Sequence, residues 1–177
     1  MSKTAILLGA TGAIGSDLLS KLLANDSYSS VLAIARKPLE ISNGKLKQLI
    51  IDFDDLDKHQ AEIKGDDIFC CLGTTAKQTP DKAIYKKIDY QYPLEVARIA
   101  LKNGAKSYHL VSAMGANPKS SIFYNKTKGE VERDLEKLNF DSIHTLRRSP
   151  PGSHQSFRRS SANRRSRGLH RNQLPRW

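Results

Sequence analysis

Residues 9–15, GATGAIG, decide the fold class of this chain. The segment follows an apolar run at 3–8 and leads directly into a helical pattern at about 13–24. At such a junction the first glycine permits a tight turn, the second lets the backbone approach a pyrophosphate, and the third lets the helix pack closely on the strand. The free N–H groups at the start of a helix attract phosphates. The segment therefore predicts a dinucleotide-binding loop, with a glycine-rich turn that binds no ligand as the alternative. The residues expected to contact the cofactor here are Gly9, Thr11, Gly12, Ala13, Ile14 and Gly15.

Short apolar runs alternate with helical patterns along residues 1–146, which is typical of a parallel sheet that is covered by helices on both faces. Strands are expected at 3–8, 30–35, 47–51, 66–71, 106–112 and 141–146. Helices are expected at about 13–24, 90–103 and 121–138, with Asp89 as the N-cap of the second. Right-handed crossover connections then predict a single doubly wound α/β domain of the Rossmann type, with strand order 3-2-1-4-5-6.

The positive charge of the chain is concentrated at its C-terminal end. The net charge is +11, yet residues 1–146 hold all 18 acidic residues and only 20 of the 29 basic ones. Residues 147–177 hold nine arginines and no acid, and they show no periodic apolar face. This composition predicts an irregular basic tail that is disordered or weakly packed. We do not expect nucleic acid as a partner, because the tail lacks interleaved aromatic residues and a folded reader.

The basic tail begins within one residue of the last predicted core strand. From Arg147 onward lysine and the acids disappear, and arginine, serine and proline dominate. A shifted reading frame and a genuine evolved tail are the two interpretations. The nucleotide sequence around the codon for Arg147 separates them, because a shifted frame predicts a longer open frame with alternating apolar runs.

Hydropathy and cysteine use indicate where the protein works. The sequence has no run of 18 apolar residues, and its first residues do not form a signal-peptide pattern, so we expect a soluble, cytoplasmic protein that does not enter a membrane. Cys70 and Cys71 are adjacent and fit no zinc spacing, which favours small strand residues of a reducing compartment. No metal site is expected, because the histidines are isolated.

The residues after the second and third predicted strands bear on the choice of cofactor. An acid after the second strand would accept a hydrogen bond from the adenosine ribose and favour NAD. Arg36 and Lys37 stand there instead, and these cations would suit the 2′-phosphate of NADP. The pair predicts that NADP(H) is favoured over NAD(H), with a solvated basic turn as the alternative. Asp52 and Phe53 are expected beside the adenine; the alternative is that the acids at 52, 54, 55 and 57 are turn and cap residues.

Four segments together resemble one enzyme family. They are GATGAIG, CLGTT at 71–75, VSAMGANPKS at 111–120 and YNKTKGEVE at 124–132. Their order over about residues 3–147 is similar to that of the atypical short-chain dehydrogenase/reductases, in particular the Tat-interacting-protein-like branch with its small NAD(P)H-binding oxidoreductases. The resemblance implies that the cofactor packs along the segment after the fourth strand, which comprises Cys71, Leu72, Gly73 and Thr74.

The resemblance also implies three catalytic residues, Ser112, Tyr124 and Lys128, and implies that Lys128 holds the nicotinamide ribose. Tyr124 and Lys128 are four residues apart and therefore share a face of the expected helix. An ammonium beside a tyrosine favours the phenolate, and a serine hydroxyl can orient a substrate carbonyl. The expected function is hydride transfer between NADP(H) and a small carbonyl or alcohol, with Tyr124 as acid/base. The alternative is a non-catalytic dinucleotide-binding regulatory protein that acts through a protein partner.

Overall fold

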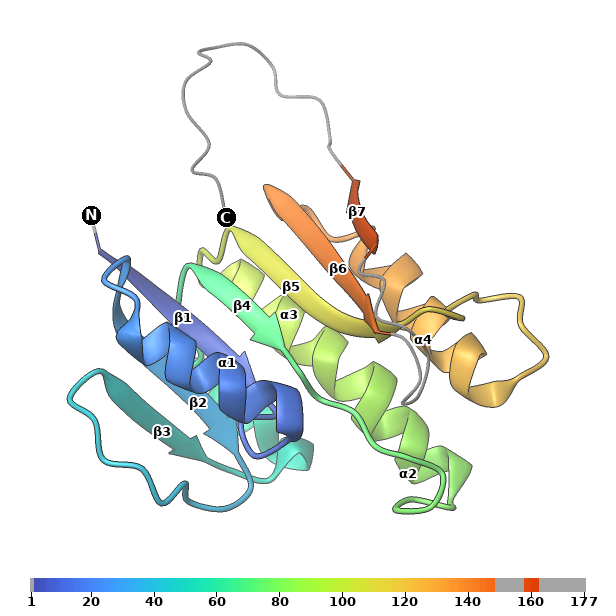
Figure 1. The fold of residues 1–177 in the computed structure, drawn as a ribbon, viewed down its shortest axis with the longest axis horizontal. Helices are drawn as coiled ribbons and strands as arrows, with labels where there is room; N and C mark the ends of the chain where they lie inside the picture. Colours follow the sequence, from blue (N-terminus) through green and yellow to red (C-terminus); the bar gives the residue numbers. More distant parts are fainter. Residues whose placement is uncertain (1, 149–157, 163–177) are drawn as a thin grey trace, which may run out of the picture.

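One sheet organises the chain (Figure 1). The computed structural model describes residues 2–148 and 158–162. Within them the strands are β1 (Lys3–Leu8), β2 (Tyr28–Ala35), β3 (Leu46–Ile50), β4 (Asp67–Cys70), β5 (Ser107–Ala113), β6 (Ser142–Arg148) and β7 (Arg158–Ala162). They lie in the order β3-β2-β1-β4-β5-β6-β7, and the first six are parallel. The predicted order and the Rossmann-type fold are therefore confirmed.

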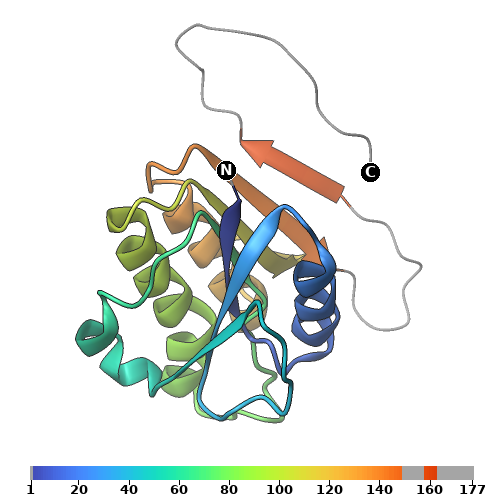
Figure 2. The same ribbon diagram turned by 90° about the vertical axis from the view of Figure 1, so that its left-hand side faces the viewer.

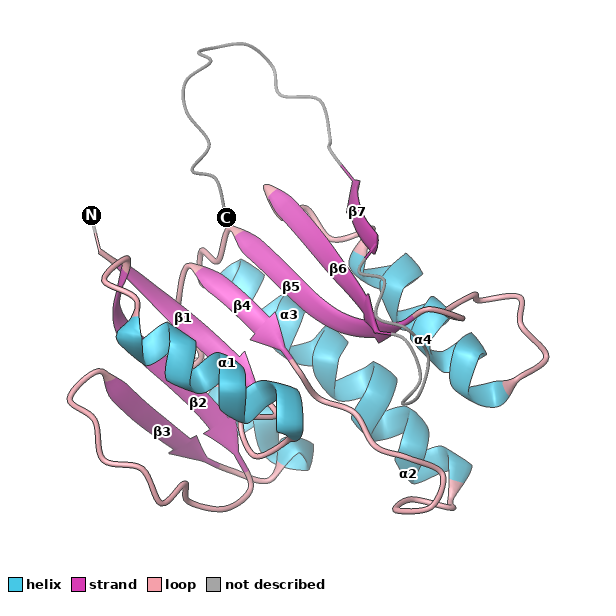
Figure 3. Cartoon of the chain, in the orientation of Figure 1, coloured by secondary structure: helices cyan, strands magenta, loops and turns pink. Residues whose placement is uncertain are grey.

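Helices cover both faces of the sheet (Figures 2 and 3). On one face lies α1 (Ala13–Ala24), which begins and ends as predicted. On the other face lie α3 (Tyr92–Lys102) and α4 (Phe123–Leu135), and a 3₁₀ helix, η1 (Phe53–His59), packs beside α3. Within the described ranges no helix is long and apolar enough to span a bilayer.

The helix that leads to β5 begins earlier than predicted. Residues Lys82–Lys86 form α2, which passes through a π-turn at Lys87–Gln91 into α3. The N-cap is Asp81, whose carboxylate accepts hydrogen bonds from the N–H groups of Ala83 at 2.7 Å and Ile84 at 3.2 Å. The prediction that Asp89 caps this helix is wrong, because Asp89 lies inside the π-turn with its side chain buried.

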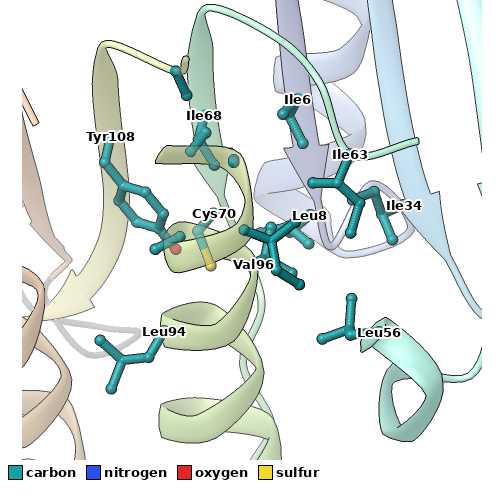
Figure 4. Packing of buried hydrophobic residues seen from close by; sticks show 14 of the residues in the cluster. Ile6, Leu8, Ile34, Leu56, Ile63, Ile68, Cys70, Leu94, Val96 and Tyr108 are labelled. Carbon is teal, nitrogen blue, oxygen red and sulfur yellow. The ribbon is translucent and has the colours of Figure 1, made fainter. Parts of the chain in front are cut away.

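Two hydrophobic clusters fill the two sides of the sheet, because successive side chains of a strand point to opposite faces. Ile6 and Leu8 of β1 belong to the larger cluster, which packs against α3 and is drawn in Figure 4. Leu7 belongs to the smaller cluster against α1. Cys70 is fully buried in the larger cluster, and Cys71, just beyond β4, packs against the smaller one. Both thiols are free.

One segment of the predicted irregular tail, Arg158–Ala162, forms the strand β7. This strand pairs antiparallel with β6, from Ile143↔Ala162 to Arg147↔Arg158. The edge of β6 would otherwise present a row of unpaired N–H and C=O groups, so an extended segment gains hydrogen bonds by adding to it. The predictions for 149–157 and 163–177, including the shifted reading frame, fall on residues outside the described ranges.

Candidate functional site

The loop between β1 and α1 is closely packed at two glycines. Gly9 has a φ of +78°, and a Cβ on it would lie 2.7 Å from the carbonyl carbon of Cys71. A Cβ on Gly15 would overlap with the carbonyl oxygen of Gly9. Only glycine therefore allows α1 to lie this close to the end of β1, and the end of β1 this close to the segment after β4.

The first turn of α1 is open to an anion. Gly12 is its N-cap, so no side chain caps the helix, and the first turn contains no acidic residue. Thr11, Gly12 and Ala13 are exposed, whereas Gly15 is buried. Free N–H groups and the positive end of the helix dipole thus reach the surface together, which suits a phosphate. The predicted loop residues at 9 and 11–15 all lie at this helix end.

Two cations follow β2, the strand next to β1. Arg36 and Lys37 are both exposed, and neither forms an ion pair with an acid of the described residues. Burial raises the pKa of the Tyr92 phenol to about 12, while the positive charge of Arg36 acts in the opposite direction. The predicted basic residues therefore stand at the carboxyl end of β2, where a phosphate can reach them.

Asp52 and Phe53 follow β3 and take part in local structure. The carboxylate of Asp52 accepts a hydrogen bond from the N–H of Asp54 at 3.0 Å and caps η1. Phe53 is buried in the larger cluster, and its ring centroid lies 5.2 Å from that of Tyr92. Asp52 thus caps a helix and Phe53 belongs to the core, and their expected place beside the adenine stays a prediction.

The three predicted catalytic residues come from β5 and α4. Ser112 is the penultimate residue of β5 and is 4% exposed, and its hydroxyl has no hydrogen-bond partner among the described residues. Tyr124 lies in the first turn of α4 with 43% of its surface exposed. Lys128 follows one turn later and is buried. A buried hydroxyl normally finds a partner in a folded protein, so Ser112 has a hydrogen bond available for a bound molecule.

Lys128 is held in a buried ion pair that sequence reasoning missed. Its ammonium lies 2.7 Å from Oδ1 of Asp89, and the two side chains are 7% and 0% exposed. The other carboxylate oxygen accepts a hydrogen bond from the N–H of Thr74 at 2.8 Å. Burial raises the pKa of Asp89, while the Lys128 ammonium and the Thr74 N–H act in the opposite direction. The sequence signal was an acid at helical spacing between Tyr85 and Pro93, which are also buried.

The segment after β4 lies against this ion pair. A Cβ on Gly73 would lie 3.4 Å from Nζ of Lys128 and 3.5 Å from Oδ1 of Asp89. The carbonyl oxygen of Thr74 accepts a hydrogen bond from the Tyr85 hydroxyl at 3.1 Å. Thr74 is thereby hydrogen-bonded to Tyr85 of α2, and Gly73 lies beside Lys128 of α4, at the carboxyl edge of the sheet.

The remaining predicted residues of this segment are Cys71 and Leu72. Burial raises the pKa of the Cys71 thiol to about 12, which disfavours a nucleophilic thiolate at neutral pH. Leu72 is partly buried against the larger cluster. Residues 2–148 and 158–162 contain no group of three His, Cys, Asp or Glu side chains that could hold a metal ion.

These residues occupy the carboxyl ends of β1, β2, β4 and β5. In a doubly wound sheet, ligands bind along this edge where the strand order reverses, which here lies between β1 and β4. The edge combines an uncapped helix end, two exposed cations, a buried ammonium and a buried hydroxyl that has no hydrogen-bond partner within residues 2–148 and 158–162. Such a set can bind an anionic dinucleotide and can offer hydrogen bonds to an uncharged group.

Comparison with known proteins agrees with this geometry. A family model described as NAD(P)H-binding matches residues 9–142. Protein HTATIP2 of Rattus norvegicus is 35% identical over 150 residues, which cover 82% of this chain and 62% of the relative. Protein FMP52, mitochondrial, of Candida albicans is 34% identical over 160 residues, which cover 88% of this chain and 69% of the relative. The chain thus spans roughly two thirds of the length of these relatives.

Solved structures share the fold at lower identity. The Bordetella bronchiseptica enzyme WbmH in complex with NAD+ superimposes with a TM-score of 0.70 at 18% identity, covering 84% of this chain and 56% of that one. MoeE5 in complex with UDP-glucose and NAD gives a TM-score of 0.65 at 19% identity, covering 81% and 53%. The chain matches about half of each of these proteins, and the likeness concerns the fold alone.

Proposed function

Because this chain belongs to the NAD(P)H-binding family, we propose that it is an NADP(H)-dependent oxidoreductase of the short-chain dehydrogenase type. It would move a hydride to or from the carbon of a small carbonyl or alcohol. The observation that carries the proposal is the buried Ser112 hydroxyl, which has no hydrogen-bond partner in the described part of the chain and lies on the same sheet edge as the open helix end of α1. A site that binds an anion and also hydrogen-bonds an uncharged oxygen is what such a reaction needs.

The loop and the basic residues after β2 would hold the dinucleotide. The free N–H groups at the start of α1 would bind its pyrophosphate, and Lys128 would bind the nicotinamide ribose. Arg36 and Lys37 would bind the 2′-phosphate, which supports NADP(H) over NAD(H) because both cations are exposed without an acidic partner in the described part of the chain. When bound, the nicotinamide supplies the hydride donor or acceptor.

Tyr124 and Ser112 would act on the substrate oxygen. Reduction of a carbonyl places negative charge on that oxygen, which then takes a proton. The hydroxyl of Tyr124, a residue that is 43% exposed at the start of α4, would donate this proton. The Ser112 hydroxyl would donate a hydrogen bond to the same oxygen and orient it. In alcohol oxidation the proton would pass in the opposite direction.

Turnover and binding measured side by side test this proposal. NADPH oxidation is followed with a panel of small aldehydes and ketones, and NADPH affinity is measured by fluorescence titration. Tyr124→Phe should lower kcat by about 10²–10⁴-fold and leave the affinity nearly unchanged, because it removes only the group that transfers the proton. If Tyr124→Phe turns over at the normal rate, another residue carries the proton. Tight NADPH binding without turnover of any substrate would favour the regulatory alternative.

A further inference from the structure

The ion pair between Lys128 and Asp89 is the feature of the site that the proposed function leaves unused. We propose that Asp89 is the counter-ion of Lys128 and thereby sets the pH range in which Tyr124 exchanges its proton. This inference rests on the proposed role of Tyr124. In this role Asp89 is a positioning residue, which acts through Lys128.

The position of the Asp89 carboxylate is defined by three elements. The π-turn at Lys87–Gln91 places Asp89 inside the protein, and π-turns within helices occur frequently at functional sites. One carboxylate oxygen faces Lys128 of α4 at 2.7 Å, and the other accepts the Thr74 N–H after β4. Both oxygens therefore face positive or partly positive groups, which oppose the effect of burial on the pKa of Asp89 and stabilise the ionised carboxylate.

The carboxylate changes what Lys128 does for Tyr124. The Tyr-x-x-x-Lys spacing alone implies a full positive charge one helical turn from the tyrosine hydroxyl. With Asp89 at 2.7 Å the ammonium belongs to a neutral pair, and the field of a pair decreases with distance faster than that of a single charge. Tyr124 should therefore exchange its proton at a higher pH than a free Lys128 would allow.

Tyr85 and Cys70 lie near Asp89 but cannot supply a negative charge in its place near neutral pH. Burial raises the pKa of Tyr85 of α2 above its usual range, and it also raises the pKa of the Cys70 thiol of β4. Both groups stay uncharged, although each lies close enough to act on Asp89. Other charges around the site form pairs of their own, Lys86 with Glu130 and Arg147 with Glu132. The charges of Lys82 of α2 and Arg148 at the end of β6 are present in wild type and in each variant, so they do not contribute to a difference between the Tyr124 midpoints.

The ionisation of Tyr124 can be measured in the protein without cofactor. The ultraviolet absorbance of the phenolate is titrated with pH in each protein and in its Tyr124→Phe partner, and the difference isolates Tyr124 from the other five tyrosines. Asp89→Asn removes the negative charge and keeps an acceptor oxygen for the Thr74 N–H. Removing this buried charge leaves the Lys128 ammonium unbalanced and should lower the Tyr124 midpoint by about one pH unit. The pH profile of kcat should move in the same direction.

A matched control separates this effect from general destabilisation. Asp67 is also a buried carboxylate paired with a lysine, Lys3 at 2.9 Å, but it lies at the start of β4, at the opposite end of the sheet. Asp67→Asn should leave the Tyr124 midpoint unchanged.

The double variant Asp89→Asn/Lys128→Met provides a second measurement, which decides the case if the single variant does not fold. It replaces a neutral pair by two neutral side chains, so its Tyr124 midpoint should stay within about 0.3 pH unit of wild type. A midpoint that is unchanged in folded Asp89→Asn, or that rises by about a full pH unit in the double variant, would overturn the inference. Absence of NADPH turnover would instead count against the proposed function, because the titration needs neither cofactor nor substrate.

Discussion

Replacing Gly12 by alanine tests the phosphate loop with little disturbance of the protein itself. A Cβ at this position would lie 3.5 Å from the carbonyl oxygen of Gly9, an ordinary contact, and the φ of Gly12 is −79°, which alanine adopts. Alanine is a poorer N-cap than glycine, but it also reduces the conformational entropy of the unfolded chain. These effects oppose each other, so the free energy of unfolding should change by less than about 1 kcal/mol.

The same methyl group should strongly weaken dinucleotide binding. If the backbone at Gly12 approaches the pyrophosphate, the methyl group occupies the space of a phosphate oxygen, and NADPH affinity should fall at least about 10-fold, or about 1.4 kcal/mol. Fluorescence titration measures the affinity, and urea unfolding measures the stability.

Two other glycines serve as controls for this experiment. Gly15→Ala should damage both stability and binding, because its Cβ would lie 2.7 Å from the carbonyl carbon of Gly9. Gly44→Ala should affect neither, because no described residue beyond its two chain neighbours has an atom within 4 Å of its Cβ position. NADPH binding of wild-type strength by Gly12→Ala would refute the placement of the pyrophosphate at this loop.

Three further substitutions test the charged groups. Arg36→Ala should remove most of a preference for NADPH over NADH, because a charge-assisted hydrogen bond contributes about 1.5–3 kcal/mol, a factor of roughly 10–150; equal affinity of the wild-type protein for both cofactors would contradict this. Lys128→Ala should lower both NADPH affinity and kcat, and normal affinity would mean that the ribose is held elsewhere. Asp67→Asn should lower the free energy of unfolding at neutral pH by about 1–3 kcal/mol. Burial alone would raise the pKa of Asp67, but hydrogen bonds from Ser107, Lys3 and Tyr28 outweigh it and lower the pKa below its usual 3.8. A lowered folded-state pKa stabilises the protein above the unfolded-state value and loses its effect as pH falls through the folded-state value. The difference in free energy of unfolding between wild type and Asp67→Asn, measured by urea unfolding, should therefore narrow as the pH falls below 3.8, the usual aspartate pKa. A difference that stays constant in this pH range would exclude the ionised Asp67 carboxylate as its source.

The strand order and the ends of α1 could be predicted because they depend on neighbours in the sequence. Glycines at 9, 12 and 15 mark a strand-to-helix junction, and right-handed crossovers leave few ways to arrange six parallel strands. The start of the helix before β5 was misplaced for an equally local reason. Aspartate is a common N-cap, and both Asp81 and Asp89 precede helical sequence, so the pattern alone does not choose between them.

The sequence by itself thus determined the fold class, the glycine-rich loop between β1 and α1, and the presence of Tyr124 and Lys128 on one helix face, since each follows from spacing over a few residues. The tertiary structure alone decided which groups meet at the sheet edge. Asp89 and Lys128 are 39 residues apart in the chain, and the Thr74 N–H comes from a third segment. Packing of the π-turn against α4 and the end of β4 excludes water from the carboxylate. Burial then makes its pairing with Lys128 necessary. The helical spacing of Asp89 with Tyr85 and Pro93 indicates a buried face, but it does not identify Lys128 as the partner.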